Sequence, residues 1–474
     1  MLNLSEIHHI HFIGIGGIGM SGLARIAVEK GFRVTGSDPN DNPAVHRLIT
    51  LGAKIHSKQS AANIQQAVPD LVVITAAIHE DNPELHAARR MALPVVSRAE
   101  FLGHIMDLYP GPRIAVTGAP GKTPTTAMIA TLLKEAGKDP TALVGGEISS
   151  LGGNALIGNG DVFLTEACEA YGSFLSLHPD ITVLTNLDVD HLDYYLTEEN
   201  LFNSFLQFVS QTNSKGSLIW CADDAGASRL MEALKEKHHA AKRISYGIQP
   251  SSSSNHYHAR NISWSEGTAN FQLCRDDSDP LCIVKLSVPG EHNILNALAS
   301  SAVALEAGLS IPDIVKGLEK YRGTARRFEI IGEAKGITIV DDYAHHPREI
   351  TATLKTARRV WPNRRIIIVF QPHLYSRTRD FMQEFAESLA DFDAIILTDI
   401  YPAREKPIPG VTMEEMMRRV SNLTKTKMLL FLEDKRQISK ELTPILHEGD
   451  VVMTVGAGDI DEVGKSLYRM LGEE

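Results

Sequence analysis

Twice along this chain, a short apolar run leads directly into a glycine-rich loop and then into a helix-like stretch. The first copy is HHIHFIG (8–14), followed by an amphipathic pattern over residues 19–31. The second copy is RIAVTG (113–118), followed by a similar pattern over residues 125–138. Apolar runs that alternate with amphipathic helices are typical of a mainly parallel sheet. The chain is therefore predicted to be an α/β protein whose sheets are covered by helices.

Length and local composition divide the chain into three parts. At roughly 150 residues per domain, 474 residues correspond to about three domains. The turn cluster YPGPR (109–113) gives the first boundary, and the second lies near 320–328, after a stretch over 251–290 whose alternation is typical of antiparallel strands. We predict a Rossmann-like domain over 1–110, a central P-loop ATPase-like α/β domain with some antiparallel strands over 111–323, and a Rossmann-like C-terminal domain over 324–474.

Charge and apolar content exclude several classes of protein. The 47 Lys and Arg residues against 58 Asp and Glu residues give a formal net charge of −11, which provides no cationic field for nucleic acid. The longest apolar run, LVVITAAI (71–78), is far shorter than the roughly 18 residues of a membrane-spanning helix. The sequence shows neither a secretory signal nor a CxxC pair among its four cysteines. We therefore expect a cytoplasmic protein that binds no nucleic acid and does not insert into a membrane.

The first glycine loop, Gly14–Gly19, has GxGxxG spacing between a predicted strand and a predicted helix. Glycines at this junction let the backbone approach a diphosphate, which the amide groups and the dipole of the helix N-terminus attract. Asp38 ends the next predicted strand, about where a ribose-binding acid lies in dinucleotide folds. The spacing selects a diphosphate without deciding between NAD, FAD and a UDP-sugar. Tight packing of strand against helix, with no ligand, is the alternative explanation.

The second glycine loop runs from Thr117 to Thr123 and contains Gly-Lys-Thr. In such a loop the backbone binds phosphate oxygens, the Lys122 ammonium reaches the β/γ region and the Thr123 hydroxyl holds Mg²⁺. The full GxxxxGK[ST] spacing is absent, because Val116 stands where the first glycine would be. Pro124 is tolerable in the first helical turn, where backbone N–H groups have no partner within the helix. A glycine turn without nucleotide is the alternative.

Acidic residues and a histidine follow the next two predicted strands. Glu166 and Glu169 come after VFLT, and His191 comes after TVLTN. Open α/β sheets bind ligands at these carboxyl ends, where a carboxylate and an imidazole could hold Mg²⁺ or Mn²⁺. Each acid on its own is more often a solvated loop charge. The phosphate loop just upstream favours the functional interpretation for Glu166 and His191. Cys168 lies between two acids, which disfavours a thiolate, so it is not predicted to be a nucleophile.

Two further candidate binding sites contain amide or guanidinium side chains. Asn293 and Asn296 share one face of a predicted helix that opens with His292, although helix capping explains Asn293 about as well. Arg326 and Arg327 could clamp a phosphate or could be an ordinary surface pair.

The last predicted domain carries two strand ends that are rich in His, Arg and Asp. DDYAHHP (341–347) follows the apolar run ITIV, and QPHLYSRTR (371–379) follows RIIIVF. Buried charges need partners, and a carboxylate substrate would supply one. We therefore favour a substrate site over simple packing here.

Taken together, these motifs resemble the Mur ligases. The resemblance rests on GIGGIGMSG, GKT, NLDVDHLDYY, GEHNILNALA, RRFE, DDYAHHPREI, QPHLYSRTRDF, YPAREKPIPGV and GAGD, and it spans nearly the whole chain. DDYxHHP with QPHxYxRT is similar to the branch that joins L-alanine to the carboxylate of UDP-N-acetylmuramate, through an acyl phosphate, for peptidoglycan synthesis. The chain departs from the family at TGAPGKTPTT, where TGTHGKTTTT is usual, and at EACEAY, where EADESD is common.

The resemblance implies ATP and Mg²⁺ (or Mn²⁺) as cofactors, UDP-N-acetylmuramate and L-alanine as substrates, and a monomer or homodimer. It implies roles for Lys122, Glu166, His191, His345 and Arg377 in catalysis, and for Thr123, Glu166 and His191 in metal binding. ATP would be bound by Gly118, Ala119, Pro120, Gly121, Lys122, Thr123, Pro124, His292, Asn293, Asn296, Arg326, Arg327, Asp341 and Asp342. The UDP-substrate would be bound by Gly16, Gly17, Ile18, Ser37, Asp38, Ala76 and Ala77. The amino acid would be bound by Tyr343, His345, His346, His373, Arg377 and Arg379.

Three other functions stay open at this point. A related ligase that attaches a recycled murein tripeptide would need a larger pocket for the amine. An oxidoreductase would use the first glycine loop but leaves Gly-Lys-Thr and the His/Arg-rich strand ends unexplained. A non-catalytic UDP-sugar sensor would be compatible with the altered phosphate loop.

Overall fold

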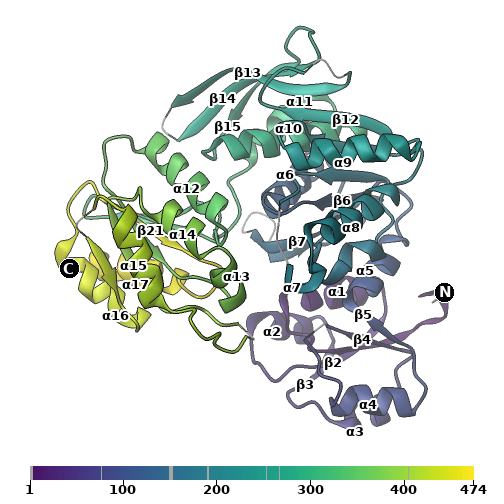
Figure 1. The fold of residues 1–474 in the computed structure, drawn as a ribbon. Coiled ribbons are helices and arrows are strands. Elements are labelled where there is room, and N and C mark those ends of the chain that lie inside the picture. Colours follow the sequence, from purple (N-terminus) through teal and green to yellow (C-terminus); the bar gives the residue numbers. More distant parts are fainter. Residues whose placement is uncertain are drawn as a thin grey trace. The chain divides into compact units, whose positions relative to one another are not determined.

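The computed structural model describes residues 4–75, 77–148, 153–188, 192–251, 254–265, 267–403, 405–426 and 428–473 (Figure 1). The chain packs into two compact units. The first contains Met1–Arg260, Gln272–Val284 and Leu295–Lys320, and the second contains Asn261–Phe271, Lys285–Ile294 and Tyr321–Glu474. The described residues form three separate sheets, of five, ten and six strands. The predicted α/β class is confirmed.

The first sheet is wholly parallel, in the order β3-β2-β1-β4-β5. The chain adds strands on one side of β1 and then crosses to the other, so the strand order reverses between β1 and β4. Ligands bind at such a point, outside the carboxyl ends of the strands. The strands are β1 (His9–Ile13), β2 (Arg33–Ser37), β3 (Lys54–His56), β4 (Leu71–Ile74) and β5 (Val95–Ser97).

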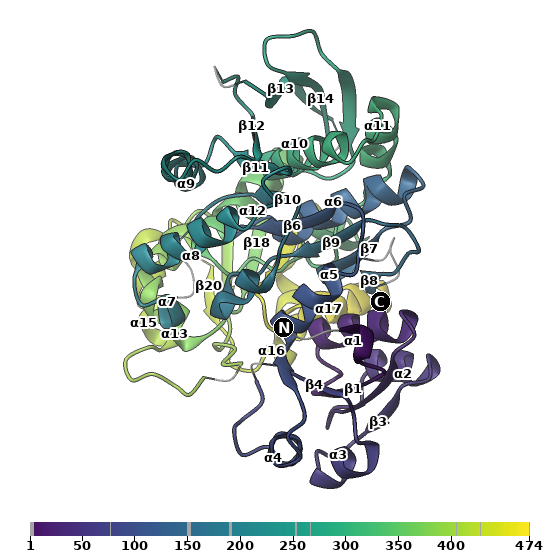
Figure 2. The same ribbon diagram turned by 90° about the vertical axis from the view of Figure 1, so that its right-hand side faces the viewer.

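Side chains of successive β1 residues point to opposite faces of this sheet, and helices cover both faces (Figure 2). Ile10 and Phe12 pack in one cluster with residues of α1 and α5, whereas Ile13 packs in another with residues of α3 and α4. The helices are α1 (Ile18–Glu29), α2 (Pro43–Thr50), α3 (Ala61–Ala67), α4 (Pro83–Arg90) and α5 (Arg98–Met106).

The second sheet has the order β15-β14-β13-β12-β11-β10-β6-β9-β7-β8. β6 lies between β10 and β9, so the phosphate loop after β6 has the ends of these two strands as neighbours. The strands are β6 (Arg113–Thr117), β7 (Thr141–Ile148), β8 (Gly153–Leu156), β9 (Phe163–Glu166), β10 (Ile181–Leu184), β11 (Ser217–Cys221), β12 (Lys242–Gly247), β13 (His256–Ser265), β14 (Thr268–Arg275) and β15 (Cys282–Leu286). The helices are α6 (Lys122–Glu135), α7 (Leu192–Tyr195), α8 (Glu198–Ser210), α9 (Ala225–Glu236), α10 (Glu291–Glu306) and α11 (Ile311–Lys320).

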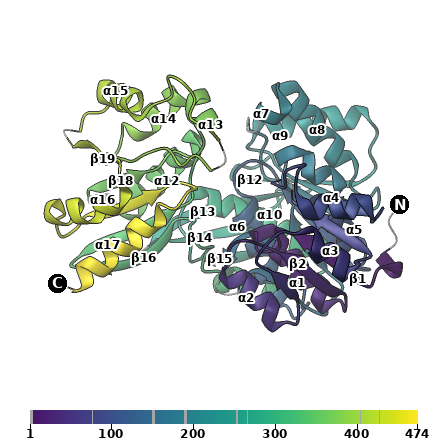
Figure 3. The same ribbon diagram turned by 90° about the horizontal axis from the view of Figure 1, so that it is seen from below.

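The third sheet has the order β16-β17-β21-β18-β19-β20, with only β16 antiparallel to its neighbour. Residues of α12, α14 and α15 pack on one face, and residues of α16 and α17 pack on the other (Figure 3). The strands are β16 (Glu329–Ala334), β17 (Ile337–Asp342), β18 (Ile366–Phe370), β19 (Ala394–Leu397), β20 (Leu429–Phe431) and β21 (Val451–Val455). The helices are α12 (Pro347–Val360), α13 (Tyr375–Asp380), α14 (Met382–Leu389), α15 (Met413–Leu423), α16 (Lys435–Leu442) and α17 (Asp461–Glu473).

Across the described ranges, no helix has both the length and the apolar character needed to cross a membrane.

Candidate active site

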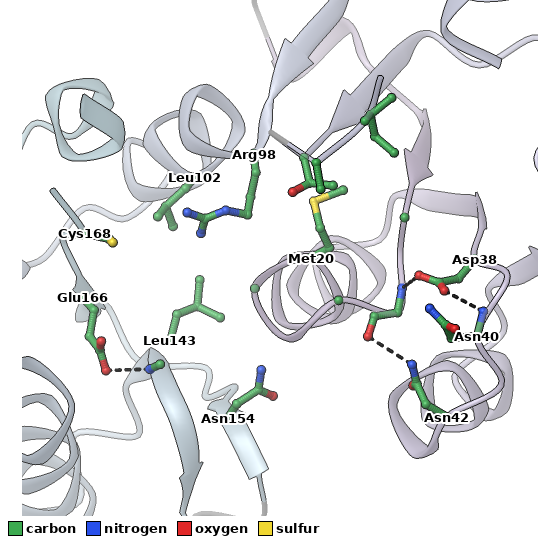
Figure 4. A pocket seen from close by; sticks show the side chains of 18 of the residues that line it. Met20, Asp38, Asn40, Asn42, Arg98, Leu102, Leu143, Asn154, Glu166 and Cys168 are labelled. Atoms are coloured by element: carbon green, nitrogen blue, oxygen red, sulfur yellow. Dashed lines mark hydrogen bonds between the residues drawn. The ribbon is translucent and has the colours of Figure 1, made fainter. Parts of the chain in front are cut away.

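A cavity of about 690 Å³ in the first unit joins the first glycine loop to the end of β9 (Figure 4). Gly16, Gly17 and Asp38 line one end, and Glu166 and Cys168 line the other. The cavity therefore extends from the predicted diphosphate site of the first domain to a predicted metal ligand of the second.

The glycines of the first loop are closely packed against neighbouring side chains. A Cβ at Gly16 would lie 2.8 Å from Asn42 Nδ2 and 2.9 Å from Asp38 Oδ2, so a larger residue would force these side chains to move. The Gly16 N–H donates to Asp38 Oδ2 at 2.8 Å. In the described part of the chain no side chain caps α1 at Gly17, so its first-turn amides can serve an anion.

The other residues predicted for the UDP-substrate have different positions. Asp38 and Ala77 line the cavity. Ser37 is fully buried, and its hydroxyl donates to Glu84 Oε2 at 2.5 Å. Ala76 and the side chain of Ile18 lie outside the described residues.

The phosphate loop between β6 and α6 is held by two residues that sequence reasoning did not select. Thr185 Oγ1 donates to Pro120 O at 2.8 Å. Asn186 Oδ1 accepts from the Ala119 N–H at 2.9 Å, and its Nδ2 donates to Pro120 O at 2.7 Å. Their only sequence signal is their position after the apolar strand β10, which pairs with β6.

Lys122 begins α6, and its ammonium is bound within the loop and to one carboxylate. Its Nζ lies 2.9 and 2.8 Å from the two oxygens of Glu169 and donates to the carbonyls of Gly118 and Ala119. Both side chains are largely buried. Burial alone would lower the pKa of Lys122, but the charge of Glu169 outweighs it and the pKa is raised. Lys122 is therefore a fixed positive charge at the loop.

Glu166 and Thr123 both lie against the glycine pair of β7. The Gly145 N–H donates to Glu166 Oε1 at 2.6 Å, and a Cβ at Gly146 would lie 3.3 Å from Thr123 Cγ2. Carboxylate and hydroxyl oxygens suit Mg²⁺, so these two residues fit the predicted metal. The third predicted ligand, His191, lies outside the described residues.

The departures from the family pattern are accommodated in the loop and the first turn. The first intrahelical hydrogen bond of α6 runs from the Thr125 N–H to Gly121 O at 3.1 Å, so Pro124 removes no helical bond. Ala119 and Pro120 contribute the backbone groups that Thr185 and Asn186 bind. Burial raises the pKa of Cys168, with the Glu169 charge adding to it, so the prediction against a nucleophilic thiol agrees with its surroundings.

Of the three residues predicted on α10, Asn296 lies beside the phosphate loop. Its Oδ1 accepts from Thr125 Oγ1 at 3.0 Å, and a Cβ at Gly121 would lie 3.3 Å from the same oxygen. Asn293 Nδ2 donates to Pro289 O at 2.6 Å, a contact within the turn before α10. Burial lowers the pKa of His292 to about 4, with the charge of Arg327 adding to it, so His292 is neutral at pH 7.

In the second unit, Arg326 is fully engaged by the protein. Its guanidinium contacts Asp341 Oδ2 at 3.0 Å and the carbonyls of Gly456 and Gly458 at 2.9 and 2.8 Å. Burial raises the pKa of Asp341 and raises that of Asp342 to about 6. The contacts of Arg326 therefore connect the carboxyl end of β17 with the residues that follow β21.

His345 lies in a buried group with charged neighbours. Its Nδ1 donates to Tyr343 O at 2.9 Å, which leaves Nε2 as the basic atom. Burial lowers the pKa of His345, against the opposing charge of Glu349. Burial disfavours the Glu349 carboxylate, but its interactions with the neighbouring His345 and Arg327 outweigh this and lower its pKa to about 2. The guanidiniums of Arg326 and Arg327 lie 5.0 and 5.2 Å from the Tyr343 ring centroid.

Of the four other His and Arg residues predicted to bind the amino acid, two lie beside His345 and two do not. The His345 and His373 ring centroids are 6.3 Å apart, and Arg377 Nη1 lies 3.3 Å from His373 Nδ1. His346 instead caps α12 and packs against the Phe381 ring, and Arg379 forms an exposed pair with Asp380. His345, His373 and the buried Arg377 are therefore the group that could hold a small anionic substrate.

Three family descriptions match successive parts of the chain. They are the Mur ligase family catalytic domain over residues 9–110, the Mur ligase middle domain over 116–304, and the Mur ligase glutamate ligase domain over 326–458.

Individual relatives match over nearly the full length. The UDP-N-acetylmuramate–L-alanine ligase of Clostridium kluyveri is 44% identical, and the alignment covers 97% of each chain. The crystal structure of UDP-N-acetylmuramate–alanine ligase MurC from Thermotoga maritima is 31% identical, with a TM-score of 0.80 over 98% of each chain. A murein peptide ligase from Psychrobacter arcticus is 26% identical, with a TM-score of 0.69 over 98% of this chain and 99% of that one.

Proposed function

The chain belongs to the Mur ligase family, and on that premise we propose that it joins L-alanine to the carboxylate of UDP-N-acetylmuramate with cleavage of ATP. The observation that carries this proposal is the cavity that joins the first glycine loop to Glu166. A UDP-linked acid has a diphosphate at one end and a reacting carboxylate at the other, so it matches a cavity with an anion-binding helix N-terminus and a predicted metal ligand. The reaction is a step of peptidoglycan synthesis, and we place it in the cytoplasm.

The reaction joins two groups that do not condense on their own in water. The substrate carboxylate attacks the γ-phosphorus of ATP and ADP leaves, then the alanine nitrogen attacks the acyl carbon and phosphate leaves. Phosphoryl transfer depends on alignment and on stabilising the charge that develops on the phosphate oxygens. Lys122, held by Glu169, supplies a positive charge at the loop, and Thr123 and Glu166 would hold Mg²⁺, which neutralises phosphate charge when bound.

The second step needs a neutral amine and a group that accepts a proton. An α-amino group with a pKa near 8 is partly neutral at pH 7, so a modest base is sufficient. We assign this role to His345 Nε2, because Nδ1 donates to Tyr343 O and burial keeps the ring neutral. Arg377 and His373 would bind the alanine carboxylate. His345→Ala should slow amide formation, whereas His346→Ala should act mainly through the lost cap; equal turnover by His345→Ala and the parent would remove the assignment.

The test is ADP release by the whole protein supplied with UDP-N-acetylmuramate, Mg²⁺ and ATP. We expect steady turnover when L-alanine is added and little without it. Release of ADP only with L-alanyl-γ-D-glutamyl-meso-diaminopimelate would identify a murein peptide ligase instead, which is the function named for the P. arcticus structure. Binding of UDP-N-acetylmuramate without ADP release under either condition would identify a sensor.

A further inference from the structure

We propose that the Arg98 guanidinium binds the reacting carboxylate of the UDP-linked acid before phosphoryl transfer. The inference rests on the function proposed above and adds a residue that the sequence motifs did not select. Arg98 lines the same cavity as the first glycine loop and Glu166, and its side chain extends into the space between them (Figure 4).

The backbone that carries Arg98 is fixed by a capping box at the start of α5. Ser97 Oγ accepts from the Glu100 N–H at 3.1 Å, and Glu100 Oε2 accepts from the Ser97 N–H at 2.7 Å. Reciprocal capping of this kind orders the first helical turn. The point from which the Arg98 side chain starts is therefore well defined relative to the cavity.

The guanidinium lies between the two ends of the cavity. A Cβ at Gly19 would come 3.2 Å from Arg98 Nη1 and 3.3 Å from its Cδ, so the side chain lies against the first turn of α1. Arg98 and Cys168, which is two residues beyond Glu166, both line this cavity. Glycine at position 19 leaves room for the Arg98 side chain, because the Cβ of any larger residue would lie too close to the guanidinium.

Within the described residues, the Arg98 guanidinium has no paired carboxylate or carbonyl, unlike two other arginines of the first unit. Within the described ranges no hydrogen bond or ion pair reaches its guanidinium, although the residue is partly buried. Arg25, on the adjacent α1, donates to Ala155 O at 3.0 Å, and Arg113 is paired with Asp180. A partly buried cation with five N–H donors and no protein partner needs an anion or water to satisfy it.

A carboxylate fits this place better than the diphosphate does. The diphosphate has the amides of the α1 N-terminus near Gly17, whereas Arg98 extends past Gly19 toward Cys168. The planar guanidinium matches the two oxygens of a carboxylate. Ligation turns that carboxylate into a neutral amide, so Arg98 would bind the substrate more tightly than the product. Because the contact belongs to the ground state, its loss should raise KM more than it lowers kcat.

The experiment is calorimetry of the whole protein, without ATP, with UDP-N-acetylmuramate and with UDP-N-acetylglucosamine, which has no carboxylate. Arg98→Met keeps the apolar stem and removes the charge. We expect it to weaken UDP-N-acetylmuramate binding by roughly tenfold to a hundredfold, the effect of hydrogen bonds to a charged group, and to leave UDP-N-acetylglucosamine binding unchanged. Arg98→Lys should recover part of the loss. Arg90→Ala, which removes an exposed arginine of α4, is the matched control and should change neither affinity.

Each other outcome has a definite meaning. Equal weakening of both ligands by Arg98→Met would place the guanidinium at the diphosphate and overturn the proposal, and unchanged binding of both would also overturn it. A parent protein that binds UDP-N-acetylglucosamine but not UDP-N-acetylmuramate would contradict the proposed function itself. Near-equal melting temperatures of parent and Arg98→Met keep a folding defect from being mistaken for a binding defect.

Discussion

The two glycine loops share one layout of strand, loop and helix, but they prepare their anion sites in different ways. In the first loop the Gly16 N–H is already bound by a carboxylate, that of Asp38. In the second loop the Ala119 N–H is bound by a neutral amide, that of Asn186, and a lysine stands at the first helical position. The first loop has no cation of its own, and the second contains Lys122.

The difference corresponds to what each loop must do. A diphosphate that is bound and left intact keeps the same charge throughout, so helix amides can serve it. A triphosphate whose terminal group is transferred develops charge at new positions, and a preorganised cation stabilises that charge. The Lys122–Glu169 pair holds the cation in place before it is needed.

The carboxylate that supports each loop also differs in its partners, which are charged at the second loop and neutral at the first. Glu169 forms an ion pair with Lys122, whereas Glu84 accepts hydrogen bonds from Ser37 and Asn63 at 2.5 and 2.6 Å. Ser37 in turn accepts the N–H groups of Gly14 and Ile15 on its carbonyl, so Glu84 supports the first loop indirectly.

Lys122→Ala should have the largest effect of any single change in either loop. It removes the cation but none of the groups that line the cavity, so kcat should fall about a thousandfold, the upper range for one preorganised donor. Affinity for UDP-N-acetylmuramate should persist. The measurements are single-turnover ADP formation and calorimetry on the same preparation.

Lys134→Ala, in the last turn of α6, is the control for Lys122→Ala, because it removes an exposed lysine of the same helix. Its kcat should equal that of the parent. If Lys122→Ala also lost UDP-N-acetylmuramate binding, this would contradict the assignment of substrate binding to the first loop and phosphoryl transfer to the second.

Glu169→Gln should be next in size, and its effect should be on stability. Breaking a buried ion pair leaves the Lys122 charge with only neutral acceptors, the backbone carbonyls and the new amide oxygen, which costs about 3 kcal/mol. Urea unfolding measures the shift in midpoint. Glu232→Gln, which breaks an exposed pair with Lys235 on α9, should cost less than about 1 kcal/mol. Equal shifts in the two variants would show that the Lys122–Glu169 pair contributes no more to stability than an exposed ion pair does.

Much of this contrast could be predicted from sequence, because it depends on local patterns. Glycine spacing and the apolar runs before it place both loops between a strand and a helix. The pattern Gly-Lys-Thr identifies Lys122 without any tertiary information. The same holds for His345, His373 and Arg377, whose strand ends are rich in polar residues where packing alone would favour apolar ones.

The supporting residues could not be predicted, because their roles depend on contacts between distant segments. Glu84 is 47 positions from Ser37, and Asn186 is 67 positions from Ala119. Asn and Glu are common on solvated surfaces, so neither residue stands out in the sequence. Arg98 begins a short and mostly buried helix, and only the folded first unit places it in a cavity. Three-residue strands such as β5 are too short to show a period.

Glu84→Gln should have a smaller and pH-dependent effect on stability. Burial alone would raise the pKa of Glu84, but the nearby His11 imidazole and the hydrogen bonds from Ser37 and Asn63 outweigh it and lower the pKa. A carboxylate with a lowered pKa stabilises the folded state above its unfolded pKa of about 4.5, and this stability is lost as the pH falls further. Glu84→Gln should therefore cost about 2 kcal/mol at pH 7 and progressively less below pH 4.

Unfolding midpoints of parent and Glu84→Gln at pH 7, 5 and 3.5 test this dependence. Glu80→Gln, which breaks an exposed pair with Arg89, is the control and should leave the unfolding midpoint nearly unchanged at each pH. A difference between parent and Glu84→Gln that is constant across this range would mean that the Glu84 carboxylate contributes no charge-dependent stability.

Asp38→Ala should have the smallest effect, and it separates two roles for this acid. Both carboxylate oxygens are engaged within the protein, Oδ2 by the Gly16 N–H and Oδ1 by the Asn40 N–H at 2.9 Å. If holding the loop is the main role, Asp38→Ala should weaken UDP and 2′-deoxy-UDP equally, by about tenfold, which is the loss of one charge-assisted hydrogen bond. Asp38→Asn keeps one of the two acceptor oxygens and removes a negative charge near the diphosphate, so it should lose less affinity for UDP than Asp38→Ala does. A loss confined to UDP would instead assign Asp38 to the ribose hydroxyls and make the first loop depend on its glycines alone.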